Sequence, residues 1–219
     1  MTTPYHAKLW AHRILLAGPK DQVAGLSRAI ANSRVDLNPH QIDAALFALR
    51  SPYSKGALLA DEVGLGKTIE AGLILSQRWA ERRRRVLLVV PATLRKQWQM
   101  ELEEKFYLPS LILESKSFND AVKRGIDNPF VDDERIVLCS YQFVYAKREL
   151  VKQVVWDLVV IDEAHRLRNI YKGTKTAEGI VEAIRPAHKL LLTATPLQNS
   201  LFELYGLVGI VDHEVFGSM

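Results

Sequence analysis

The sequence predicts an α/β fold in which a mostly parallel central sheet lies between two layers of helices. Short runs rich in Val, Ile and Leu recur along the chain, and such runs suit strands that are buried on both faces of a parallel sheet. Helix-like segments lie between these runs, and this alternation is typical of open α/β sheets. We expect strands at residues 57–60, 86–90, 111–113, 136–139, 158–161 and 189–192, and helices at 41–49, 68–79, 94–106, 118–123, 174–184 and 201–210.

The composition supports a packed domain. The chain has 219 residues, of which 48% are hydrophobic and 25% charged, and this balance is ordinary for a soluble protein. A net charge of +4 permits a nucleic-acid partner without requiring one. The single cysteine, Cys139, lies in an apolar run, which favours a buried structural thiol and a reducing, cytoplasmic setting. No apolar stretch reaches the roughly 18 residues of a membrane span, so we expect no membrane partner.

The first 35 residues differ from the rest. Residues 7–16 and 22–31 have the pattern of two short helices joined around Gly18-Pro19. We therefore expect a helical N-terminal extension over residues 1–35 that packs on a main domain over residues 36–219.

A phosphate-binding turn is predicted between the strand at 57–60 and the helix at 68–79. The segment 60–68 reads Ala-Asp-Glu-Val-Gly-Leu-Gly-Lys-Thr, and the N–H groups of such a turn and of the following helix end attract an anion. Lys67 is expected to reach the terminal phosphates of a nucleotide, and the Thr68 hydroxyl to hold Mg²⁺. Asp61 replaces the first glycine of G-x-x-x-x-G-K-[ST]. A dinucleotide site is excluded, because it needs glycine at Ile69.

An acidic pair follows the predicted strand at 158–161. Asp162 and Glu163 lie at the carboxyl end of this strand, where ligands gather in open α/β sheets. Asp162 is expected to hold Mg²⁺ through its water shell, and Glu163 to polarise the attacking water. A metallopeptidase is not supported, because the chain has no H-E-x-x-H. The alternative, in which the two carboxylates only cap the next helix, is less favoured beside the phosphate-binding turn.

Three segments in order resemble motifs I, II and III of superfamily-two helicases: residues 61–68, 162–165 and 193–199. The Asp-Glu-x-Gly-Leu-Gly-Lys-Thr form is typical of the Swi/Snf branch of helicase-like, DNA-translocating ATPases, which carries Asp at the position of Asp61. The bacterial members, including the RNA-polymerase-recycling ATPases, are the most similar. The resemblance covers about residues 37–218 and implies a RecA-like (P-loop NTPase) lobe that uses ATP and Mg²⁺. The implied nucleotide-binding residues of motif I are Asp61, Glu62, Val63, Gly64, Leu65, Gly66, Lys67 and Thr68, and the implied catalytic residues are Lys67, Asp162 and Glu163.

Two further assignments follow from the resemblance. Residues 38–41 resemble the upstream adenine-recognition motif, in which Gln41 would read the base edge. The alternative for this segment is a plain helix start, with Asn38 as the cap and Pro39 in the first turn. In motif III, Thr193 and Thr195 would help couple the nucleotide state to lobe movement, although the segment alone reads as an ordinary strand end.

Residues 91–98 resemble motif Ia, which grips a nucleic-acid backbone. The resemblance implies phosphate contacts from Thr93, Arg95 and Lys96 at the start of a helix. The alternative is a solvated helix start with Trp98 in the core.

Two other segments are candidates for nucleic-acid contact. Ser140-Tyr141 resembles a further backbone-contact motif, but a purely structural role is about equally favoured. The four arginines at 82–85 are more simply a solvated turn after a helix, where cations complement the helix dipole.

The family has two RecA-like lobes that bind ATP between them, and the present sequence ends soon after motif III. We expect an N-terminal lobe of a longer protein that, with its second lobe, hydrolyses ATP, moves on duplex DNA and displaces DNA-bound protein cargo. The second lobe supplies arginines, and a missing arginine finger costs a factor of about 10³–10⁵ in rate, so the isolated lobe should be nearly inactive. Two alternatives stay open: an incompetent interaction or regulatory module with the same fold, and a small-molecule P-loop kinase, in which residues 193–199 have no role.

Overall fold

The computed structural model describes residues 38–50, 55–60, 66–197 and 200–215. The expected N-terminal helices at 7–16 and 22–31 lie outside the described residues. The described chain contains a six-stranded, all-parallel sheet with the strand order β1-β6-β5-β2-β4-β3. The strands are β1 (Gly56–Leu59), β2 (Val86–Val90), β3 (Ser110–Ile112), β4 (Ile136–Ser140), β5 (Leu158–Asp162) and β6 (Lys189–Leu192).

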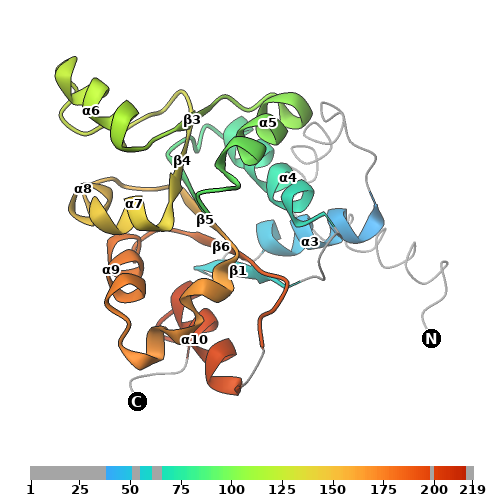
Figure 1. Ribbon diagram of the computed structural model, residues 1–219. Helices are drawn as coiled ribbons and strands as arrows, with labels where there is room; N and C mark the ends of the chain where they lie inside the picture. Colours follow the sequence, from blue (N-terminus) through green and yellow to red (C-terminus); the bar gives the residue numbers. More distant parts are fainter. Residues whose placement is uncertain (1–37, 51–54, 61–65, 198–199, 216–219) are drawn as a thin grey trace.

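Helices cover both faces of the sheet (Figure 1). One face packs on α3 (Pro39–Arg50), α4 (Lys67–Ala80) and α5 (Arg95–Phe106). The other packs on α6 (Ser115–Lys123), α7 (Tyr141–Ala146), α8 (Arg148–Lys152), η1 (Ala164–Lys172), α9 (Lys175–Ala183) and α10 (Leu201–Val211). The α/β fold with a parallel sheet and two helical layers is therefore confirmed.

The sequence of β2 shows how one strand serves both cores. Its five residues are all buried, with Val86, Leu88 and Val90 in the core under α3–α5 and Leu87 and Val89 in the core on the opposite face. Side chains alternate between the two faces of a strand, so a continuous apolar run is what such a position requires.

The carboxyl ends of five strands are level with one another. Leu192 at the end of β6 pairs with Leu59 of β1 on one side and with Asp162 of β5 on the other. On the far side of β5, β2 ends with Val90 opposite Ser140 of β4. The segments that follow β1, β6, β5, β2 and β4 must therefore start along one edge of the sheet.

Every strand and helix expected between residues 41 and 210 is present, with ends shifted by at most a few residues. The short helices α7, α8 and η1 were not predicted. Within the described ranges, no helix has both the length and the apolar character that a membrane crossing requires.

Candidate nucleotide-binding site

The Lys-Thr end of motif I forms the N-terminus of α4. Gly66 precedes the helix with φ 88° and ψ 36°, a left-handed conformation that favours glycine. Its carbonyl accepts the N–H groups of Ile69 and Glu70 at 2.7 and 3.1 Å, so the turn leads directly into the helix. Lys67 and Thr68 occupy the first turn, where backbone N–H groups have no intrahelical acceptor and suit an anion. Asp61 to Leu65, the rest of the predicted nucleotide-binding turn, lie outside the described residues.

Gln41 packs against this turn from α3. Its side chain is buried, its Oε1 accepts the N–H of Asn38 at 3.1 Å, and a Cβ added to Gly66 would lie 2.3 Å from its Nε2. The alternative prediction for this segment, a helix start at Asn38 and Pro39, agrees with the structure as well, because α3 begins at Pro39. Gln41 thus joins the beginning of the domain to motif I, while its contact with a base stays a prediction.

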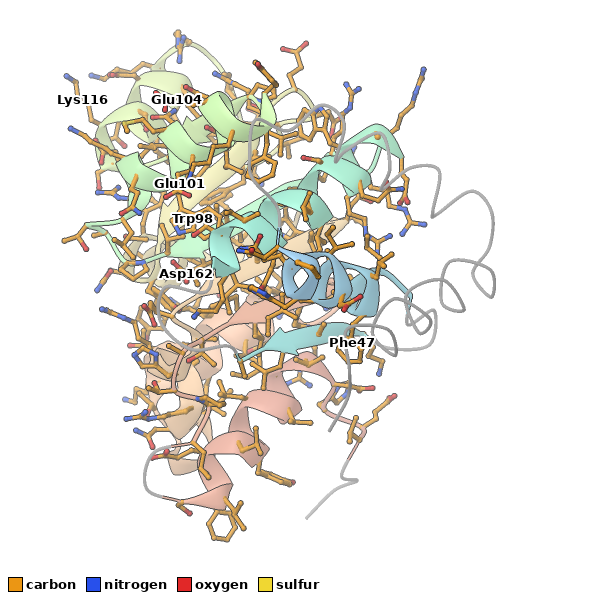
Figure 2. All side chains as sticks on the ribbon, turned by 90° about the vertical axis from the view of Figure 1, so that its right-hand side faces the viewer. Phe47, Trp98, Glu101, Glu104, Lys116 and Asp162 are labelled. Atoms are coloured by element: carbon orange, nitrogen blue, oxygen red, sulfur yellow. The ribbon has the colours of Figure 1, made fainter. Side chains whose placement is uncertain are left out.

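Asp162 is the last residue of β5 and is held by three donors. Its Oδ1 accepts the N–H of Glu163 at 2.8 Å, and its Oδ2 accepts the indole N–H of Trp98, also at 2.8 Å. The hydroxyl of Tyr141 donates to its carbonyl oxygen. Figure 2 shows the side chains of Trp98 and Asp162 next to each other. The carboxylate therefore has a fixed orientation at the carboxyl edge of the sheet.

The electrostatics of Asp162 link it to motif I. Burial raises the pKa of this carboxyl above its usual value, while the Trp98 hydrogen bond and the positive charge of Lys67 act in the opposite direction. Lys67 begins α4, the helix that follows β1, and Asp162 ends β5, so both residues lie at the carboxyl edge of the sheet. The start of α4 and the acidic pair, far apart in the sequence, thus lie along one edge of the sheet.

His165 connects Glu163 with Thr193 of motif III, because both side chains approach its Nδ1 atom. Glu163 has φ 55°, an uncommon value for a residue with a side chain, and its Oε2 is 3.1 Å from Nδ1 of His165. The Thr193 hydroxyl is 3.4 Å from the same nitrogen and accepts the N–H of Thr195 at 3.2 Å. Thr193 is fully buried, whereas Thr195 is exposed. Motifs II and III are therefore joined by a chain of polar contacts.

The motif Ia residues surround a surface hollow of about 350 Å³ between the starts of α5 and α6. Thr93 and Lys96 are exposed there, and the guanidinium of Arg95 pairs with the carboxylate of Glu114 at 2.9 Å. Trp98 is buried in the core, as expected if residues 91–98 are a solvated helix start. Its indole N–H also donates a hydrogen bond to Asp162. No sequence pattern predicts that hydrogen bond, because it depends on how α5 packs on β5.

The other candidate segments have clear structural roles. Ser140 and Tyr141 are buried, and the Ser140 hydroxyl caps α7 by accepting the N–H of Phe143 at 3.2 Å. Their contact with nucleic acid stays a prediction. Cys139 is fully buried, and burial raises the pKa of its thiol, as expected of a structural cysteine.

The arginines at 82–85 form an exposed turn at the opposite edge of the sheet, before β2. Arg84 lies over the ring of Trp79 at 5.1 Å, and Arg85 pairs with Asp133 at 2.9 Å. These contacts agree with the simpler interpretation of a solvated turn.

A parallel sheet with a Gly-Lys-Thr helix start and an acidic pair along one edge is the P-loop NTPase fold. The chain belongs to the SNF2-related domain family, which it matches over residues 40–219.

Known relatives agree with this family. The chain is 39% identical over 197 residues to the RNA polymerase-associated protein RapA of Vibrio vulnificus, covering 86% of the chain and 20% of that protein. With RapA of Pectobacterium atrosepticum it is 42% identical over 171 residues, covering 75% of the chain and 17% of that protein. The chain thus spans about a fifth of the length of these curated relatives.

A solved structure has the same fold. It is the Sulfolobus solfataricus SWI2/SNF2 ATPase core in complex with dsDNA, with a TM-score of 0.66 and 24% identity, and the match covers 85% of this chain and 38% of that one.

Proposed function

We propose that the chain is the N-terminal ATP-binding lobe of a DNA-dependent ATPase that moves on duplex DNA together with a second RecA-like lobe. In this proposal the lobe covers residues 36–219, and residues 1–35, which lie outside the described residues, would be a helical extension. The carboxyl edge of the sheet carries this proposal, because Lys67 at the start of α4 and Asp162 at the end of β5 both lie there. The level ends of β1, β6 and β5 support it, since all three helicase motifs start there.

The residues of this edge fit a nucleotide with its magnesium ion. The turn from Asp61 to Thr68 would surround the phosphates, with Lys67 as their cation, and Gln41 would contact the base. Thr68 and Asp162 would hold the Mg²⁺. Among the described residues no group of three or more His, Cys, Asp or Glu side chains could hold a metal. Magnesium at nucleotide sites usually takes one or two protein ligands and completes its shell with phosphate and water, which suits this pair.

The residues around Glu163 suit the activation of water. ATP would supply the phosphoryl group. Bound Mg²⁺ would neutralise the negative charge that develops on this group. Glu163 would orient and polarise the attacking water, and the neighbouring His165 would fix the position of its carboxylate. Thr193 contacts the same imidazole and the backbone of Thr195, so these two threonines would report the state of the site to the second lobe.

Duplex DNA is the proposed track. Thr93 and Lys96 are exposed at the start of α5, where they and Arg95 would contact backbone phosphates. Ser140 and Tyr141, at the end of the adjacent strand β4, are the other proposed contacts. One similar structure holds dsDNA, and the curated relatives are named as RNA polymerase-associated. A DNA-bound protein is therefore the proposed cargo, and the bacterial cytoplasm the proposed location.

The test compares ATP turnover by the isolated 219-residue chain and by the longer protein that contains it, with and without duplex DNA. We expect DNA to stimulate the longer protein, and the isolated chain to bind Mg²⁺ and ATP but to hydrolyse ATP about 10³–10⁵ times more slowly. Absence of nucleotide binding by the chain, or turnover of the longer protein that ignores DNA, would contradict the proposal. The former result would favour an interaction module.

A further inference from the structure

Asp162 receives hydrogen bonds from two aromatic side chains that approach from opposite faces of the sheet. Trp98 lies in the core under α3–α5 and donates to Oδ2 at 2.8 Å. Tyr141 lies in the opposite core and donates its hydroxyl proton to the main-chain carbonyl of the same residue. The two donors are only 3% and 5% exposed, so water does not compete well for either bond. Asp162 is thus clamped through its side chain and its backbone at once.

The same two residues belong to the segments that are expected to contact nucleic acid. Trp98 is in the first turn of α5, two residues after Lys96 and three after Arg95. Tyr141 is the first residue of α7, directly after Ser140 at the end of β4. The hydrogen bonds to Asp162 therefore connect the N-terminal ends of α5 and α7 with the acidic pair. Because each connection is one side chain long, a shift of either element must also move a donor on Asp162.

The hydrogen bonds to Asp162 leave its carboxylate able to accept a water molecule of a hydrated cation. Trp98 occupies one lone pair of Oδ2 and the Glu163 N–H one of Oδ1, and each carboxylate oxygen has a second lone pair for a water of a hydrated cation. Hydrogen-bond donors that orient a metal-binding carboxylate in advance reduce the conformational entropy that the carboxylate loses when the ion binds. Such donors therefore increase the affinity for the metal.

We propose that Trp98 and Tyr141 are positioning residues that hold Asp162 for the magnesium ion of a bound nucleotide and make this hold depend on nucleic-acid contact at α5 and α7. This inference rests on the proposed function. Both side chains are buried, so both would act through Asp162 and not by contact with the nucleotide.

The test uses variants that remove one donor and keep the ring: Trp98→Phe and Tyr141→Phe. Trp156→Phe is the matched control, because Trp156 is also buried and donates its indole N–H at 3.0 Å, but to the carbonyl of Val151. Tyr145→Phe is the control for the tyrosine, since Tyr145 is on the same helix and packs against Gly179 and Arg148. Thermal unfolding shows whether each variant folds.

The first measurement is the dissociation constant of ATP for the 219-residue chain, with Mg²⁺ and with EDTA. The ratio of the two constants gives the gain in affinity from the metal. We expect Trp98→Phe and Tyr141→Phe to lower this gain about tenfold without changing the affinity in EDTA, and both controls to keep the wild-type gain. A merely structural role would lower the two affinities together or neither. Equal gains in the wild type and both donor variants overturn this inference alone. A wild-type chain that binds no ATP overturns the proposed function and this inference with it.

The second measurement addresses the connection with nucleic acid. In the longer protein, the factor by which a short duplex changes the affinity for ATP and Mg²⁺ equals, by linkage, the factor by which the nucleotide changes the affinity for DNA. We expect this factor to move toward one in both donor variants and to stay at the wild-type value in Trp156→Phe. An unchanged factor in the donor variants overturns the dependence on nucleic-acid contact.

Discussion

The backbone N–H of Thr193 donates to the carbonyl of Leu59 at 3.0 Å, so motif III begins against the last residue of β1. Motif I starts after that same strand, and Asp162 of motif II lies opposite Leu192, the residue before Thr193. The three segments, which begin at residues 61, 162 and 193, thus follow three adjacent strands of the sheet. This alignment is a direct result of parallel pairing, which brings all carboxyl ends to one edge.

Glu163→Gln should abolish hydrolysis and preserve binding. The amide keeps the size of the side chain but cannot accept a proton from water, and the loss of a general base costs about 10²–10⁴ in rate. Single-turnover hydrolysis by the longer protein, together with its ATP affinity, is the measurement. Glu149→Gln, on the exposed side of α8, is the control. Unchanged turnover in Glu163→Gln would remove Glu163 from the proposed role.

Gly66→Ala should lower the affinity for ATP as well as the stability of the fold. Gly66 and Gly125 have nearly the same left-handed φ, 88° and 87°, and alanine costs about 1–2 kcal/mol in this conformation. A Cβ at Gly66 would meet Gln41 at 2.3 Å, whereas at Gly125 it would meet nothing within 4 Å. We expect both variants to lose similar backbone energy, but only Gly66→Ala to lose ATP affinity, by about tenfold or more. The same ATP affinity in the two variants would speak against the turn as the phosphate site.

DNA binding by the isolated chain should be weak and should fall steeply with salt, because backbone contacts release counterions. Lys96→Ala should lower the affinity and reduce the slope of log affinity against log salt by about one. Lys105→Ala is the control on the same helix, since Lys105 lies in the last turn and pairs with Glu101 at 3.1 Å. A complex that is selective for sequence and insensitive to salt would contradict tracking along the backbone.

The stability of the fold should decrease in mild acid because of His188. Burial, together with the charges of Arg78, Lys189 and Arg83, lowers the pKa of this imidazole to about 4. An unfolded histidine has a pKa of about 6.5, so between these values the unfolded chain binds a proton that the folded chain excludes. The contribution of neutral His188 is therefore complete above pH 6.5 and is lost as the pH falls toward 4.

We expect His188 to account for about 1–2 kcal/mol of this loss once solvent screening is included. Urea unfolding of the wild type and of His188→Gln at pH 7 and pH 4.5 measures it, and the variant should lose less stability over that interval. Equal losses would show that another group is responsible.

The sheet could be predicted because its strands are continuous apolar runs. Residues 86–90 and 189–192 were predicted to the residue, since burial on both faces of the sheet leaves few other options for Val- and Leu-rich segments. The helix predicted at 118–123 begins earlier, at Ser115, because Glu114 and Ser117 form a capping box at its start. The helices α7 and α8 were missed because five or six residues are too few to show a helical period, and η1 was missed because it is a 3-10 helix with a kink at Asn169.

The site was only partly accessible from the sequence. Motif spacing and strand ends were sufficient to place Lys67 and Asp162 at one edge, since parallel strands allow no other arrangement of their carboxyl ends. The hydrogen bond from Trp98 to Asp162 could not be predicted, because an indole in an apolar helix face is equally a core residue. Its role depends on the packing of α5 against the end of β5, which no local pattern records.

The most direct test of the account is a calorimetric titration of the 219-residue chain with ATP in the presence of Mg²⁺. Lys67→Ala is compared with Lys152→Ala, whose lysine pairs with Glu182 at 2.7 Å and is exposed. The account predicts binding by the wild type and by Lys152→Ala, and a loss of affinity of about tenfold or more in Lys67→Ala, because a charge-assisted contact to phosphate disappears. Equal heats from the two variants, or none from the wild type, would contradict a nucleotide held between Lys67 and Asp162.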